Sequence, residues 1–98
     1  MTINKTATDT ALTLALEGRL DTTTAPALEE ELKNSLEGVA ELTLDFEKLE
    51  YMSSAGLRVL LSAQKQMNKQ GKMTIRNVCA DIMEVFEITG FSDILTVE

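Results

Sequence analysis

Apolar and polar residues alternate along several short segments of the chain, which is the pattern of strands with one buried face. Five segments have this character or a strand-like composition, at residues 3–7, 11–17, 41–46, 73–76 and 94–97. The turn residues Thr8-Asp9-Thr10 join the first two into a predicted hairpin, and Gly18 is predicted to end the second strand. Asp45 then lies near the C-terminal end of the third predicted strand.

Three other segments repeat apolar residues at spacings of three and four, which predicts amphipathic helices. The first begins at about Thr23 to Ala25, before the only proline, Pro26, which a first helical turn tolerates. The second covers residues 57–70, and the third is capped by Asn77. The resulting order is strand, strand, helix, strand, helix, strand, helix, strand.

This alternation predicts an α/β fold. We expect a mixed, mostly parallel sheet with an N-terminal antiparallel hairpin and about three packed helices. No linker, low-complexity tract or repeat interrupts the 98 residues, so a single domain is expected over residues 1–98.

Composition removes several classes of function. The chain contains no histidine, which takes away the usual general base of a serine or cysteine nucleophile and the commonest zinc ligand, so we expect no enzyme. Phosphate-loop, dinucleotide-binding and cysteine metal motifs are absent, so no cofactor or metal is expected. The single Cys79 allows no internal disulfide, and no segment has the 18 to 20 apolar residues of a membrane span. A cytoplasmic protein without membrane insertion is the prediction.

Charge is distributed unevenly. The formal net charge of −7 repels nucleic acid, and we expect no nucleic-acid partner. Between Tyr51 and Ala80, however, no acidic residue occurs, and this block carries five lysines and arginines. The simplest explanation of this block is that its basic residues lie at solvent-exposed ends of helices and strands. The block nevertheless contains the stretch on which the functional prediction depends.

That stretch is Ser53-Ser54-Ala55-Gly56, where a strand-like run gives way to a helix-like one. One serine can be a simple helix cap, and Gly56 can serve close packing. Alternatively, the start of a helix accepts an anion, so a phosphate on either serine would be stabilised there. A nucleophile elbow is disfavoured because Met52 replaces its first glycine and no histidine is present.

The wider sequence resembles a known family. The run Tyr51-Met-Ser-Ser-Ala-Gly-Leu-Arg58, preceded by Glu17-Gly-Arg-Leu-Asp21, Thr24-Ala-Pro26 and Leu42-Thr-Leu-Asp45, is similar to STAS domains of the bacterial anti-sigma factor antagonist group. The resemblance implies a partner-switching protein. Its unphosphorylated form binds an anti-sigma factor with serine kinase activity, phosphorylation releases it, and a protein phosphatase restores it.

The resemblance also assigns site residues. It places the phosphorylated serine at Ser54, with Ser53, which stands where family members often have aspartate, as second choice. Partner binding is assigned to Ser53, Ser54, Ala55, Gly56, Leu57 and Arg58. The resemblance adds Asp21 and Asp45, which match acidic positions that family members place near the site. Two alternatives remain open: an unphosphorylated STAS subunit of a stress-signalling or transporter complex, and a nucleotide site at the same loop. Self-association is also left open.

Overall fold

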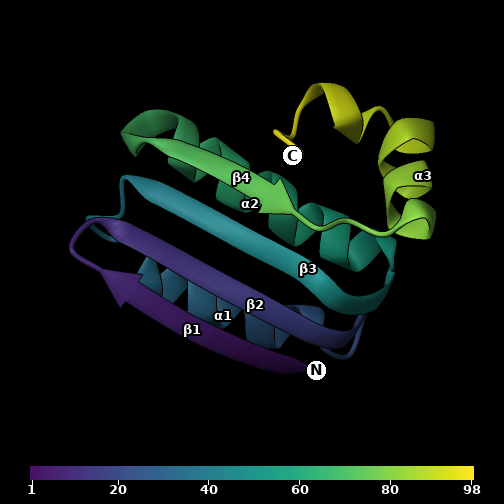
Figure 1. Ribbon diagram of the computed structural model, residues 1–98, viewed down its shortest axis with the longest axis horizontal. Helices are drawn as coiled ribbons and strands as arrows, with labels where there is room; N and C mark the ends of the chain where they lie inside the picture. The colour runs from purple at the N-terminus through teal and green to yellow at the C-terminus, as the bar shows by residue number, and fades with distance from the viewer.

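Four strands form one mixed sheet in the computed structural model, which describes residues 1–98 (Figure 1). The elements are β1 (Thr2–Thr8), β2 (Ala11–Leu20), α1 (Ala25–Ser35), β3 (Glu41–Met52), α2 (Ser54–Gln70), β4 (Lys72–Arg76), α3 (Ala80–Thr89) and a 3-10 turn, η1 (Phe91–Asp93). The strand order is β1-β2-β3-β4, with β1 antiparallel to β2 and the other neighbours parallel. The predicted mixed α/β fold with an N-terminal hairpin is therefore confirmed.

The core lies between the sheet and the two helices behind it in Figure 1, α1 and α2. Alternate residues of β2 and β3 are buried, and the apolar stripes of the helices cover them. Leu14, Leu44 and Leu60 are completely buried at its centre. Removing a leucine side chain from water contributes about 1.5–3 kcal/mol, so this layer stabilises the position at which α2 begins.

The third strand is longer than predicted. Alternation ends at Phe46, and the next buried residues are Leu49 and Met52, three positions apart. Two irregularities in the pairing with β2, each with an extra residue on β3, account for this change of period. The chain therefore stays in the sheet until Met52, and the predicted strand end after Phe46 was wrong.

The second strand also continues beyond its predicted end. Gly18 does not break β2, because it adopts a φ of +100° and still pairs with Leu49 beside the second irregularity. Glycine reaches this φ without steric cost. The strand consequently runs on to Leu20, which pairs with Met52.

The third helix begins later than predicted. Cys79 occupies the N-cap position of α3, whereas Asn77 has a φ of +58° and its Nδ2 donates to Asp45 Oδ1 at 2.9 Å. Asn77 is therefore a turn residue and not the predicted cap. Its short polar side chain suits this left-handed conformation.

The predicted strand at residues 94–97 is absent. The 3-10 turn keeps the chain coiled, since the N–H groups of Ile94 and Leu95 both bond to the carbonyl of Phe91. Only a single bridge remains, in which Ile75 N donates to Thr96 O at 2.9 Å and Glu98 N donates to Ile75 O at 2.9 Å. The C-terminus thus covers part of the β4 edge without adding a strand.

Candidate functional site

The start of α2 is fixed to the end of β2. Ser53 has an extended conformation and is the N-cap residue, and its N–H donates to the carbonyl of Leu20 at 2.9 Å. Its own carbonyl accepts the N–H of Leu57 at 3.2 Å. The two serines therefore lie at the carboxyl ends of the parallel strands β2 and β3, where α/β proteins commonly place their functional groups.

Ser53 and Ser54 have different surroundings. The Ser53 hydroxyl is buried and has no hydrogen-bond partner, and no side chain caps α2. Ser54 is the first residue of the helix and is exposed. Ser53 thus occupies the N-cap position predicted for one serine, but its hydroxyl makes no capping hydrogen bond. Of the two hydroxyls, only that of Ser54 belongs to an exposed residue.

We expect Ser53→Ala to leave the free energy of unfolding unchanged or slightly higher, within about 1 kcal/mol. The reason is that the substitution removes a buried hydroxyl that makes no hydrogen bond, whereas loss of a true cap costs about 1 kcal/mol. Urea denaturation measures the difference.

Thr24→Ala is the matched control for this substitution. The Thr24 hydroxyl donates to Arg19 O at 2.7 Å and accepts from Asp21 N at 2.9 Å, so its removal should cost about 1–2 kcal/mol. A loss for Ser53→Ala as large as that for Thr24→Ala would contradict the observed environment of Ser53.

Asp21 lies at the same end of the sheet, directly after Leu20. Its Oδ1 accepts the hydroxyl of Thr23 at 2.8 Å and the N–H groups of Thr23 and Thr24 at 3.0 and 3.2 Å. The hydrogen bond from the Thr23 hydroxyl, with the two backbone bonds, lowers the pKa of Asp21. This carboxylate shapes the β2–α1 loop and adds negative charge beside the start of α2.

Asp45 makes no hydrogen bond at the start of α2. It lies within β3, paired with Ala15 and Arg76, and its Oδ1 accepts Asn77 Nδ2 at 2.9 Å and Glu47 N at 3.0 Å. The bond from Asn77, then that from the Glu47 backbone, lowers the pKa of Asp45. The structure therefore ties Asp45 to the β4–α3 connection, and none of its hydrogen bonds reaches the start of α2.

The lowered pKa of Asp45 predicts acid sensitivity. Its stabilising contribution is present above the ordinary aspartate pKa of about 3.9 and is lost as pH falls through the lower pKa of the folded state. Between about pH 5 and pH 2, the free energy of unfolding of Asp45→Asn should therefore decrease less than that of the wild type. Denaturation at several pH values measures the two slopes.

Asp93→Asn is the control, because the exposed Asp93 carboxylate accepts no side-chain hydrogen bond and forms no ion pair. The substitution removes one negative charge, as Asp45→Asn does, without removing a side-chain hydrogen bond. Equal slopes for Asp45→Asn and the wild type would show that the Asn77 and Glu47 bonds do not stabilise the carboxylate.

The remaining predicted binding residues differ in how far they are exposed to solvent. Gly56 and Leu57 are buried and Ala55 is half-buried, while Arg58 is exposed. A Cβ on Gly56 would lie 2.7 Å from Leu20 Cγ and 3.1 Å from Met52 Cγ, so this glycine allows α2 to approach the two strand ends. Gly56 and Leu57 therefore position the site, and Ser54 and Arg58 are its exposed groups.

One pair of residues was missed from the sequence. Arg19 stacks over the ring of Tyr51, with its guanidinium carbon 4.2 Å from the ring centre, and Tyr51 is 42% exposed. Their strands pair Arg19 with Tyr51. This neighbourhood depends on the extension of both β2 and β3 beyond their predicted ends, which the alternation did not reveal.

Neither a metal-binding cluster nor a membrane-spanning helix is found. No three histidine, cysteine, aspartate or glutamate side chains are grouped to hold a metal ion. None of the helices is both long enough and apolar enough to cross a bilayer.

Known proteins resemble this chain over most of its length. The model of the STAS domain family matches residues 2–98. BtrV of Bordetella bronchiseptica is 38% identical over 91 residues, which are 91% of this chain and 78% of BtrV. The anti-sigma-B factor antagonist of Bacillus subtilis is 32% identical over 83 residues, which are 84% of this chain and 76% of that protein.

Among solved structures, the Bacillus anti-sigma factor antagonist SpoIIAA superimposes with a TM-score of 0.78 at 18% identity, in both its unphosphorylated and its phosphorylated form. The match covers 99% of this chain and 87% and 91% of those two chains. At 18% identity, this likeness shows only that the fold is shared. Membership of the family is shown by the match to the family model and by the two relatives that are more than 30% identical. The chain therefore belongs to the STAS domain family.

Proposed function

We propose that this protein is an anti-sigma factor antagonist that acts by partner switching under the control of Ser54. In this proposal the unphosphorylated protein binds, in the cytoplasm, an anti-sigma factor that is also a serine kinase. The kinase transfers the γ-phosphoryl group of ATP to Ser54 Oγ, which loses its proton, and ADP leaves. The phosphorylated protein dissociates, and a protein phosphatase returns it to the binding form. The protein itself acts as a regulator and not as an enzyme.

The observation that carries the proposal is the exposure of Ser54 at the first position of α2, beside a Ser53 hydroxyl that is buried. A kinase must reach the hydroxyl that it modifies, and this condition favours Ser54 over Ser53. Relatives named as anti-sigma factor antagonists, and the existence of a phosphorylated form of SpoIIAA, support the same role.

The surroundings of Ser54 suit a phosphate. The first N–H groups of a helix lack partners within it, and the helix dipole contributes about half a positive charge at this end. No residue of α2 is acidic, while Arg58, Lys65 and Lys69 are basic. Phosphorylation adds a charge of about −1.5 to −2 that this environment accepts without unfolding, so its effect falls on the docked partner.

The test is incubation with the cognate kinase and ATP, followed by mapping of the phosphate by mass spectrometry. We expect one phosphate on Ser54 in the wild type and in Ser53→Ala, and none in Ser54→Ala. A protein that remains unmodified, or that carries its phosphate on Ser53, would contradict the proposal.

A further inference from the structure

The exposed side of α2 carries a row of basic residues that begins one turn after Ser54. At 3.6 residues per turn, Ser54, Arg58, Lys65 and Lys69 fall within about 60° of one another around the helix. All four are exposed, and α2 contains no acidic residue that could pair with the cations. The serine and the three cations thus form one line along the helix surface.

Arg58 is the member of this line that can reach Ser54. The two residues are separated by four positions, the spacing at which side chains on a helix are neighbours. Side chains in a helix also lean toward its N-terminus, so Arg58 leans over the turn that contains Ser54. Measured from Ser54, Lys65 and Lys69 lie about 16 Å and 22 Å along the helix axis.

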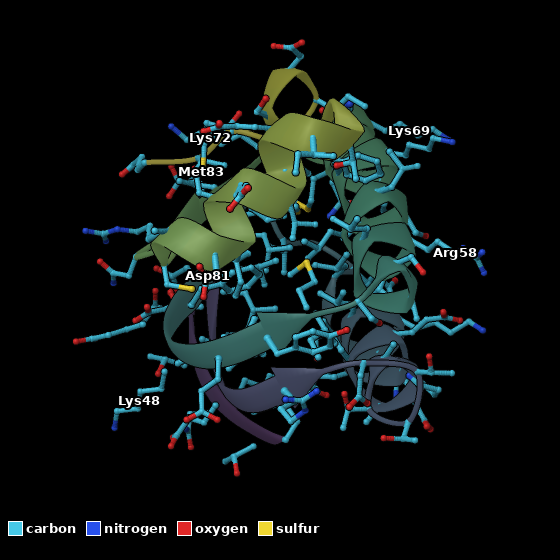
Figure 2. All side chains as sticks on the ribbon, turned by 90° about the vertical axis from the view of Figure 1, so that its right-hand side faces the viewer. Lys48, Arg58, Lys69, Lys72, Asp81 and Met83 are labelled. Atoms are coloured by element: carbon cyan, nitrogen blue, oxygen red, sulfur yellow. The ribbon has the colours of Figure 1, made fainter.

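The guanidinium of Arg58 is not engaged in the unmodified protein. It takes part in neither of the two ion pairs, which are Arg19–Asp21 and Arg76–Glu98, and it donates no side-chain hydrogen bond. Figure 2 shows its side chain projecting from the outer side of α2, away from α3.

Arg19, the other guanidinium at this end of the sheet, is already held by neighbouring groups. It stacks on Tyr51, and its Nε lies 3.8 Å from Asp21 Oδ2. In β2 it is adjacent to the buried Leu20, so its side chain belongs to the sheet face opposite the helices. Arg58 therefore remains the free guanidinium nearest to Ser54 on α2.

We propose that Arg58 binds the phosphate when Ser54 is phosphorylated. This inference rests on the proposed function, and it adds the group that receives the modification. A guanidinium donates two parallel N–H bonds to phosphate oxygens, and its charge offsets the repulsion from the carboxylate of Asp21 at the same edge. One phosphorylation then alters two exposed groups, because it adds charge at Ser54 and withdraws Arg58 from the surface offered to a partner.

The experiment uses the full chain with phosphoserine incorporated at position 54 during synthesis. Titration by ³¹P NMR gives the second pKa of this phosphate in the wild type and in Arg58→Gln. We expect that pKa to be about 0.3 lower in the wild type, as an ion pair at this helical spacing implies. Circular dichroism verifies that both proteins are folded.

Two controls each remove one positive charge elsewhere. Lys65→Gln and Lys69→Gln alter the same line farther from Ser54, and both should leave the phosphate titration as in the wild type. An Arg58→Gln titration equal to that of the wild type, or matched by either control, would overturn the inference. The measurement needs neither kinase nor partner, so its failure is distinguishable from failure of the proposed function.

Discussion

Replacing Gly71 with alanine is expected to lower the free energy of unfolding by about 3 kcal/mol. A Cβ at this position would lie 1.9 Å from the carbonyl oxygen of Ala40 and 2.6 Å from its carbonyl carbon. That carbonyl cannot easily move away, since it accepts the N–H of Lys72 at 2.9 Å and Ala40 N donates to Thr10 O at 2.8 Å. The midpoint of thermal unfolding should fall by more than about 10 °C in a domain of this size.

Gly38→Ala is the matched control for this prediction. Gly38 has a φ of +78°, and no atom lies within 4 Å of the position that a Cβ would take. Alanine there should therefore lower the free energy of unfolding only by the cost of a left-handed backbone conformation, about 1–2 kcal/mol. Thermal and urea unfolding of both variants separate the two effects. If Gly71→Ala were no less stable than Gly38→Ala, the close approach of the α2–β4 connection to Ala40 would be wrong.

Introducing a carboxylate at the proposed switch is expected to weaken binding to the anti-sigma factor by at least about tenfold, which is about 1.4 kcal/mol. Ser54→Asp places a negative charge in the surface that we propose docks with Ser54 unphosphorylated, so binding would have to desolvate this charge or overcome its repulsion. The thermal midpoint should not fall, because an acidic residue in the first turn suits the helix dipole. Isothermal titration calorimetry measures the affinity.

Ser62→Asp provides the charge-matched control. Ser62 is exposed on the same helix, two turns beyond Ser54, so the variant has the same net charge as Ser54→Asp with the new carboxylate farther from the helix start. Ser54→Ala should retain the wild-type affinity. Equal weakening by Ser54→Asp and Ser62→Asp would mean that general electrostatics, and not the Ser54 surface, governs binding.

The alternation of apolar residues was sufficient to predict the hairpin and the parallel strands, and their spacing of three and four predicted the long helix, because each of these elements buries one regular face. The errors lie where that regularity ends. Two extra residues on β3 change its period after Phe46, and Gly18 continues its strand at a positive φ. The chain after Phe91 has a strand-like composition, yet local turn hydrogen bonds hold it in a coil.

For the candidate site, the residues alone indicated the stretch, and only the family resemblance ranked Ser54 before Ser53; neither could show that the two serines differ in burial. Burial depends on which residue ends the strand and which begins the helix, and the pairing of Leu20 with Met52 decides both. The distinction between Ser53 and Ser54 is therefore a tertiary effect. The stacking of Arg19 on Tyr51 was equally inaccessible, since it needs the register of strands whose ends were predicted too early.

The two irregularities in β3 also give the segment between Phe46 and Ser53 a fixed length. This segment brings Met52 opposite Leu20 with its side chain toward the core. Deleting one residue here would remove an extra residue on which this register depends, so that Met52 would no longer lie opposite Leu20 and Gly56 would lose its close packing on both side chains. We therefore expect the length of residues 47–52 to determine where the proposed switch lies relative to the ends of β2 and β3.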